Sequence, residues 1–266
     1  MSDVVPLRQP DRGPAARREQ VRRRVLAEGF ARIDDLAREF DVSLMTMHRD
    51  LDGLAAEGWL TKIRGAATAN PSALLEAGVR ERSAALRNEK VAIAEVAANS
   101  LRQGQTIFLD DSTTALALVP YLVAHAPITV ASNFVPVLTA LADVPEVELH
   151  VLGGQYFRTQ EACFGMQTVD AIAQLRADVF FMSTTAVNHG SCYHRSEWTV
   201  MVRKAFMAAA ARSILLVDHA KFGRTAPHLM CSLDKFDTVI TDAGIDPEDL
   251  RALRIVNHDV IVADVD

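Results

Sequence analysis

The sequence predicts an α/β protein with two domains: a small N-terminal winged helix-turn-helix and a larger, Rossmann-like, mostly parallel α/β domain. Two patterns predict this division. Residues 15–69 hold three short helical patterns and a hairpin pattern, whereas from residue 89 onward short apolar runs alternate with amphipathic stretches. A chain of 266 residues, 49% of them apolar, is long enough to build two cores.

The first domain is expected over residues 15–69, after a disordered lead-in at 1–14 that contains three prolines. Helices are predicted at 15–28 and 33–40, and a third from Ser43 to about Glu57. A strand at 59–63, a turn at 64–65 and a returning strand at 66–68 follow. Three helices and a hairpin in fewer than 60 residues are typical of a winged helix-turn-helix.

The third helix is the predicted DNA-reading element. Ser43 is placed to cap its N-terminus, and Gly58 fits the position just beyond its end. Its apolar side chains recur at spacings of three and four, which form one stripe of an α-helix: Leu44, Met47, Leu51 and Leu54. This stripe is expected to pack into the domain core, together with Trp59.

The candidate DNA contacts lie on the other side of this helix and on the wing. They are Ser43, Met45, Thr46, His48 and Arg49 on the helix, with Lys62 and Arg64 on the wing. Arg49 is the candidate for a bidentate contact to guanine, which gives about 1–3 kcal/mol of discrimination. The alternative is that Arg49 neutralises a phosphate without reading sequence. Lys62 and Arg64 are expected to touch the DNA backbone.

Asp50 lies at the border of the apolar stripe. Because phosphates would repel its carboxylate, we expect Asp50 to pair with an arginine of the same domain.

The charge distribution is compatible with a DNA partner, although the net charge of the chain is −6. Residues 1–68 hold 12 Lys and Arg against 11 Asp and Glu, and seven of these arginines lie between Arg8 and Arg24. A locally basic face on an acidic protein favours specific over non-specific DNA binding. A solvated arginine-rich tail is the alternative.

Several function classes are excluded by composition. There is no run of about 18 apolar residues, so no membrane span is predicted. The N-terminus has arginines without an apolar core after them, unlike a secretory signal. Three scattered cysteines fit a reducing cytoplasm. We predict no cofactor and no metal, and we expect the cluster His189, Cys192 and His194 to line a pocket rather than to bind a metal.

Residues 70–88 are predicted as a linker helix, and the second domain spans 89–266. Its helices are expected at 89–102, 114–124, 134–142, 166–175 and about 197–210. Its strands are expected at 106–109, 128–131, 147–152, 179–182, 213–217 and 236–240, and the tail at 254–262 is compatible with an edge strand. Short apolar strands separated by amphipathic helices predict a parallel sheet that is covered on both faces.

Six motifs follow one another in a specific order. They are V-S-L-M-T-M-H-R-D-L at 42–51, R-G-A-A at 64–67, D-D-S-T-T at 110–114, S-N at 132–133, G-G at 153–154 and D-H-A-K-F-G at 218–223. By these motifs and their spacing, the chain resembles the DeoR family of bacterial transcriptional regulators over nearly its whole length. His48, Ala66 and Ser112 depart from the family pattern, which has an arginine and two glycines there.

The resemblance implies that the second domain is an effector domain similar to sugar-phosphate isomerases, with a phosphorylated sugar or related metabolite as its ligand. The candidate effector-binding residues follow predicted strand ends, where open parallel sheets bind ligands: Asp110, Asp111, Ser112, Thr113, Thr114, Asn133, Gly153, Gly154 and Lys221. Backbone amides and hydroxyls at a helix N-terminus favour a phosphate. Simple N-capping by the 111–113 segment is the alternative.

Within this site, Lys221 would supply a positive charge for the phosphate, and Asp110 and Asn133 would hydrogen-bond sugar hydroxyls. Glu197, Arg203 and Lys204 are expected to lie on a solvated helix face, and a role in the pocket or in a subunit contact is the alternative.

The predicted function is a transcriptional regulator, a repressor of genes for sugar uptake or catabolism whose operator binding a phosphorylated sugar modulates. Two-fold DNA sites imply a homodimer or homotetramer. The alternative is a sugar-phosphate isomerase with a DNA-binding appendage, which would use Asp110 or Glu197 as a base. A sugar kinase is disfavoured because the sequence has no G-x-x-x-x-G-K-[ST] loop.

Overall fold

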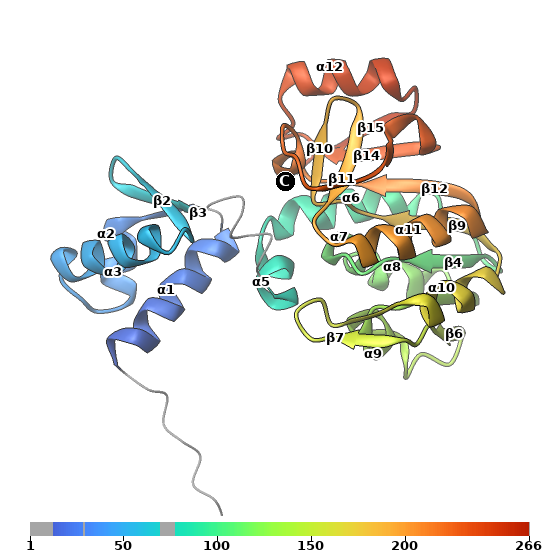
Figure 1. The fold of residues 1–266 in the computed structure, drawn as a ribbon, viewed down its shortest axis with the longest axis horizontal. Helices are drawn as coiled ribbons and strands as arrows, with labels where there is room; N and C mark the ends of the chain where they lie inside the picture. Colours follow the sequence, from blue (N-terminus) through green and yellow to red (C-terminus); the bar gives the residue numbers. More distant parts are fainter. Residues whose placement is uncertain (1–12, 29, 70–77, 266) are drawn as a thin grey trace, which may run out of the picture. The chain divides into compact units, whose positions relative to one another are not determined.

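The structure, a computed structural model, describes residues 13–28, 30–69 and 78–265. The chain divides between Leu86 and Arg87 into two compact units, each with its own elements (Figure 1). Most of the predicted lead-in, and residues 70–77 of the linker helix predicted at 70–88, lie outside the described residues. None of the described helices has the length and apolar character that crossing a bilayer requires.

The first unit has the predicted winged helix-turn-helix fold. It contains α1 (Pro14–Glu28), α2 (Ile33–Glu39) and α3 (Leu44–Ala56). Its antiparallel sheet has the order β1-β3-β2, formed by β1 (Phe30–Arg32), β2 (Leu60–Ile63) and β3 (Ala66–Ala69). The strand β1 is not predicted by the sequence, because three residues are too few to display an alternating pattern.

The signals at both ends of α3 are confirmed. The Ser43 hydroxyl accepts a hydrogen bond from the Thr46 amide at 3.2 Å, and Gly58 has the left-handed φ of +84° that follows a helix end. Met47, Leu51 and Leu54 are buried as predicted, together with residues of α1 and α2.

The prediction that Leu44 is buried is wrong, since Leu44 is 50% exposed. Helical side chains lean toward the helix N-terminus, so that of the first helical residue projects past the end of the helix.

A further short helix, α5 (Val79–Ala84), belongs to the first unit and contacts α1. Val79 is buried, and Arg22 Nη2 of α1 lies 3.9 Å from Glu81 Oε1. The described end of the predicted linker therefore packs onto α1 of the first unit.

The second unit is built on a seven-stranded parallel sheet with the order β15-β14-β12-β9-β4-β5-β6. Its strands are β4 (Thr106–Leu109), β5 (Ile128–Ser132), β6 (Val147–Val151), β9 (Ala177–Met182), β12 (Ala210–Leu216), β14 (Thr238–Asp242) and β15 (Val260–Ala263). The chain moves outward from β4 through β5 and β6, then continues on the other side of β4 with β9. The strand order therefore reverses between β4 and β9, which is where Rossmann-like sheets bind ligands.

Helices flank this sheet. They are α6 (Arg87–Ala98), α7 (Thr113–Leu116), α8 (Val119–Ala124), α9 (Val135–Leu141), α10 (Met166–Ala173), α11 (Glu197–Ala209) and α12 (Pro247–Val256). α6 contacts β12, β14 and β15, whereas α11 contacts β9 and β12. Consecutive residues of β4 and β9 are buried, as expected for strands covered on both faces.

Two predicted elements need correction. The single helix expected at 114–124 is two short helices, and Pro120, which has no amide hydrogen, lies in the first turn of the second one. The tail at 254–262 is only partly a strand. Its first residues end α12, and the later ones belong to β15, which lies at one edge of the sheet. Asp246 followed by Pro247, a cap before a proline, is the sequence signal for α12.

Two small antiparallel sheets are not predicted by the sequence. One is the hairpin β7 (Gln155–Phe157) with β8 (Ala162–Phe164), and the other has the order β10-β11-β13, formed by β10 (Ala186–Asn188), β11 (Ser191–His194) and β13 (His228–Ser232). The segment expected as a pocket loop is thus a hairpin, whose turn residues His189 and Gly190 both have positive φ. Among the described residues, no group of three or more His, Cys, Asp and Glu is placed to hold a metal.

Candidate DNA interface and candidate effector pocket

The outward face of α3 carries the predicted DNA contacts. Met45, His48 and Arg49 are exposed, and Met45 reaches 71%. Ser43 and Thr46 are engaged with each other, since their hydroxyl oxygens lie 2.9 Å apart. This face therefore presents one apolar, one imidazole and one guanidinium side chain on a helix whose other side is buried.

Asp50 fixes this helix to α1, as predicted. Its buried carboxylate accepts a hydrogen bond from Arg17 Nε at 2.7 Å, and Arg18 Nε lies 3.7 Å from its other oxygen. The pair removes a carboxylate from the face that would meet phosphates.

On the wing, Lys62 lies beside the reading helix. Its Nζ is 2.6 Å from Asp52 Oδ1 of α3, a pair that the sequence analysis missed. Arg64 is exposed at the wing turn, next to Gly65, whose φ of +74° suits a tight turn.

The arginine-rich segment is less basic than predicted. All five arginines of α1 form ion pairs with carboxylates of the same unit: Arg17 and Arg18 with Asp50, Arg22 and Arg23 with Glu19, and Arg24 with Glu39. The i,i+3 and i,i+4 spacings on the helix bring Glu19 to its partners. Arg8 and Arg12 lie outside the described residues.

In the second unit, a buried ionic cluster lies where the strand order reverses. Asp110 follows β4, and its carboxylate accepts hydrogen bonds from the Ser112 amide at 3.0 Å and from the Ser183 amide, just beyond β9, at 2.9 Å. Asp110 and Asp111 are both buried. The D-D-S-T-T loop is thus tied to the neighbouring strand end.

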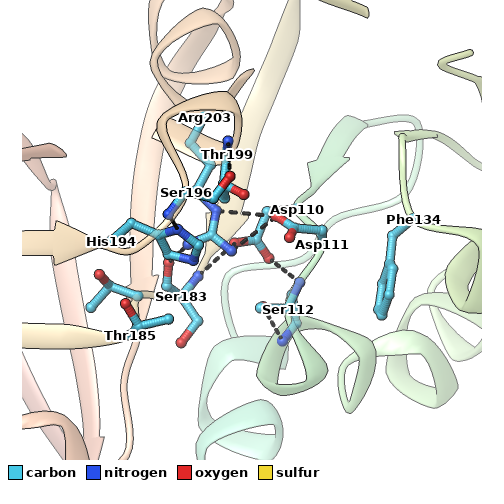
Figure 2. A network of polar contacts seen from close by, with 12 residues as sticks. Asp110, Asp111, Ser112, Phe134, Ser183, Thr185, His194, Ser196, Thr199 and Arg203 are labelled. Carbon is cyan, nitrogen blue, oxygen red and sulfur yellow. Dashed lines mark hydrogen bonds and ion pairs between the residues drawn. The ribbon is translucent and has the colours of Figure 1, made fainter. Parts of the chain in front are cut away.

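Arg203 of α11 completes this cluster and is 3% exposed. Its Nη2 lies 3.0 Å from Asp110 Oδ2 and 3.0 Å from Asp111 Oδ1, and its Nη1 donates to the Ser183 carbonyl at 2.7 Å. Figure 2 shows the guanidinium reaching from α11 between the two strand ends. The prediction that Arg203 lies on a solvated helix face is therefore wrong.

The cluster holds two carboxyl groups and one guanidinium. Burial raises the pKa of the Asp110 carboxyl, and the Arg203 charge opposes that rise. Burial alone would lower the pKa of Arg203, but the two aspartates raise it. Arg203 is therefore held charged in the interior by its partners.

The rest of the D-D-S-T-T loop is buried as well. The Ser112 hydroxyl accepts a hydrogen bond from the Ala115 amide at 3.0 Å, so it caps α7. Thr113 and Thr114 have little exposed area. The capping interpretation accounts for Ser112, and an effector contact by this loop stays a prediction.

Asn133, a predicted site residue, and Asp218, which the sequence analysis did not name as a site residue, hold buried oxygen atoms that receive no hydrogen bond from the described residues. Asn133 Nδ2 donates to the Cys163 carbonyl at 2.8 Å, but no described donor reaches its buried Oδ1. Asp218 is 0% exposed, and neither carboxylate oxygen accepts a hydrogen bond from a described residue. Lys221 Nζ lies 3.6 Å from Asp218 Oδ2. Buried acceptors that receive no hydrogen bond from the protein indicate a position where a ligand or a water molecule donates one.

The predicted glycines differ in their roles. A Cβ on Gly154, whose φ is +149°, would lie 2.2 Å from Thr168 Oγ1 and 2.6 Å from the Phe164 carbonyl oxygen, so close packing requires this glycine. Gly153 accepts a hydrogen bond from the same Thr168 hydroxyl at 2.7 Å, and a Cβ on it would meet nothing within 4 Å.

A histidine–aspartate pair lies beside Lys221 in sequence and was missed by the sequence analysis. His219 Nδ1 is 2.6 Å from Asp242 Oδ2, and the His219 amide donates to Asp242 Oδ1 at 2.7 Å. The hydrogen bond to Asp242 raises the pKa of the His219 imidazole. Although burial acts in the opposite direction, this contact lowers the pKa of Asp242.

Two protein-family models match the chain. The model of the DeoR C-terminal sensor domain matches residues 86–243, and that of the DeoR-like helix-turn-helix domain matches residues 17–73. Each model therefore covers most of one compact unit.

Curated relatives are similar over most of their length. The lactose phosphotransferase system repressor of Lactococcus lactis subsp. lactis is 32% identical, over 84% of this chain and 89% of the relative. The glycerol-3-phosphate regulon repressor of Escherichia coli K12 is 30% identical, over 82% of this chain and 87% of the relative. The L-fucose operon activator of Haemophilus influenzae is 28% identical, over 88% of this chain and 93% of the relative.

Solved structures are matched more distantly. The ribose 5-phosphate isomerase A of Methanocaldococcus jannaschii is 15% identical, with a TM-score of 0.37 over 50% of this chain and 53% of that one. This likeness is too low to support a conclusion about activity.

Proposed function

The chain belongs to the DeoR family of transcriptional regulators, and from that premise we propose that it is a repressor of sugar-utilisation genes controlled by a phosphorylated sugar. The relatives support the repressor assignment, since two of those compared are named as repressors and one as an activator. The observation that carries the sensor part is that the buried acceptor atoms of Asn133 Oδ1 and the Asp218 carboxylate receive no hydrogen bond from any described residue.

For DNA, we propose that the candidate contacts on α3 and the wing bind an operator: Ser43, Met45, Thr46, His48, Arg49, Lys62 and Arg64. Arg49 reads a guanine, because its guanidinium is exposed and offers two parallel donors. Ser43 and Thr46 set the start of the helix, and Arg64 contacts the backbone. Lys62 also contacts the DNA backbone, when a phosphate replaces Asp52 as the partner of its ammonium group.

For the effector, we propose a pocket at the carboxyl ends of β4, β5, β6, β9 and β12. The carboxylate of Asp218 and the amide oxygen of Asn133 accept hydrogen bonds from sugar hydroxyls, which satisfies both buried groups. Lys221 supplies charge for the phosphate. Asp110, Asp111, Ser112, Thr113 and Thr114, with Gly153 and Gly154, shape the wall of this pocket.

We propose a sensor rather than an isomerase. Asp110, one candidate base, already accepts from two amides and faces Arg203. Glu197, the other candidate, is exposed at the start of α11. The relatives compared are named as regulators, which supports the absence of turnover. We further propose that the protein acts in the cytoplasm as a homodimer or homotetramer that matches a two-fold operator.

The test combines two readouts on the full chain. A panel of sugar phosphates is screened by thermal shift, and the DNA site is obtained by selection from random duplexes. Asp218→Asn and Lys221→Ala are expected to lose the thermal shift while DNA binding persists. Arg251→Ala, on an exposed position of α12, is the control. Turnover of any sugar phosphate, or an unchanged thermal shift in Asp218→Asn and Lys221→Ala, would contradict the proposed pocket.

A further inference from the structure

Two of the three cysteines face each other across adjacent strands. In the register of β11 with β13, Cys192 is paired directly with Cys231. Directly opposed residues in an antiparallel sheet have Cα atoms about 4.5–5.5 Å apart, within the range of about 4.4–6.8 Å that a disulfide spans. Both cysteines are free thiols in the structure.

The two thiols lie in different environments. Cys192 is fully buried, and burial together with its contact to Cys231 raises its pKa well above the usual value. Cys231 is only partly buried. Its pKa is lowered, first by the hydrogen bond with Cys192 and then by the charges of Lys204 and Lys235. A more acidic, accessible thiol beside a buried one is the arrangement of an attacking and a resolving cysteine.

We propose that Cys192 and Cys231 are an oxidation site at which a peroxide forms a reversible intrachain disulfide. The Cys231 thiolate attacks one peroxide oxygen, the O–O bond breaks, and hydroxide leaves and takes up a proton to become water. The Cys192 sulfur then attacks the Cys231 sulfenic acid, the S–O bond breaks, and water leaves with the Cys192 proton. The two sulfurs lose two electrons, which reduce the peroxide.

The position of the pair connects it to the buried ionic cluster. β11 ends at His194, whose Nδ1 accepts a hydrogen bond from the Ser196 amide at 3.0 Å. The Ser196 hydroxyl in turn caps α11, the helix that carries Arg203 (Figure 2). A cross-link between β11 and β13 therefore restrains the segment that leads into this helix, and we expect slower amide exchange there. If the proposed function is right, effector affinity changes too, and this last consequence rests on it.

The chemistry is tested on the full chain with hydrogen peroxide. Non-reducing digestion and mass spectrometry should find the peptides of Cys192 and Cys231 joined and two hydrogen atoms lighter, with reversal by dithiothreitol. The Cys163→Ser variant should form the same link. In Cys192→Ala the sulfenic acid at Cys231 should persist and be trapped by dimedone. Cys231→Ser should consume peroxide more slowly than the unchanged chain, because burial raises the pKa of the two remaining thiols.

Three results would overturn the oxidation site: no intrachain link in the folded protein, first oxidation at Cys163, or links formed only between chains. Hydrogen exchange of residues 194–203 tests the restraint without any ligand, and exchange unchanged by oxidation would overturn the link to α11. Because none of these readouts uses DNA or an effector, a failure here is distinguishable from a failure of the proposed function.

Discussion

The two units hold their charged side chains in opposite ways. In the DNA-binding unit, ion pairs such as Arg24–Glu39 and Lys62–Asp52 are partly exposed and orient a surface. In the sensor unit, Asp110, Asp111 and Arg203 are buried together at the switch point of the sheet. Exposed pairs contribute little to stability, whereas breaking a buried one leaves an uncompensated charge. The comparison predicts that charge substitutions affect recognition in the first unit and folding in the second.

The largest effect is expected at Arg203. Arg203→Met leaves Asp110 and Asp111 buried without their cation, so the free energy of unfolding should fall by about 3–5 kcal/mol. Urea denaturation at neutral pH measures the change. Lys204→Met, the exposed neighbour on α11, is the control and should stay within about 0.5 kcal/mol. A loss below about 1 kcal/mol for Arg203→Met would mean that the cluster does not support the fold.

Arg49→Ala tests the other side of the comparison. It should weaken binding to the selected DNA site by about 1–3 kcal/mol, mainly through lost discrimination between bases. Fluorescence anisotropy with the selected and a scrambled duplex measures this difference. Stability should change by less than about 0.5 kcal/mol, since Arg49 is exposed. Equal loss on both duplexes would assign Arg49 to a phosphate instead.

Asp50→Asn lies between these extremes, because Asp50 is buried but its partner Arg17 is partly exposed. Loss of the charged hydrogen bond should lower the free energy of unfolding by about 1–3 kcal/mol and loosen α3 against α1. Asp52→Asn, on the exposed side of the same helix, is the matched control. If both variants unfolded at the same urea concentration, the buried pair would have no special role.

The smallest effect is expected at His219. Its pKa is raised in the folded state, so the stability it contributes is fully present below about pH 6.5 and is lost as pH rises through the folded value. The lowered pKa of Asp242 means that its contribution is present above about pH 3.9 and is lost as pH falls through the folded value.

The His219–Asp242 pair therefore contributes most between about pH 4 and 6.5. Since the His219 side chain is 31% exposed, the contribution should be below about 1 kcal/mol. His219→Gln should flatten the pH dependence of unfolding in this window, whereas His258→Gln, an exposed imidazole, should not. An unchanged profile in His219→Gln would remove the pair as a source of pH dependence.

The same comparison explains what could be predicted from the sequence. The reading helix is specified locally, because a serine cap, an apolar stripe and a terminal glycine lie within 16 residues of one another. Most strands of the main sheet are short apolar runs and were also predicted. Among the strands that were missed, β1 and β10 have three residues each, too few to show an alternating pattern. β1 pairs with the distant strand β3, whereas β10 pairs with its neighbour β11 across a tight turn.

The strand-end cluster could be predicted only in part. Asp110 and Asp111 were recognised from their position after a strand, but their partner Arg203 lies 92 residues beyond Asp111. One signal was present: Thr199, Arg203 and Phe206 share the buried stripe of α11. An arginine on such a stripe requires a buried carboxylate partner, and only the sheet topology reveals which one.

The central claim is that effector and operator binding are coupled. The most direct test is the dissociation constant of the selected DNA site with and without the sugar phosphate that gives the largest thermal shift. Coupling of about 1–3 kcal/mol predicts that the effector weakens DNA binding by roughly 5–150-fold, and that DNA weakens effector binding by the same factor. An unchanged dissociation constant at saturating effector would contradict the claim.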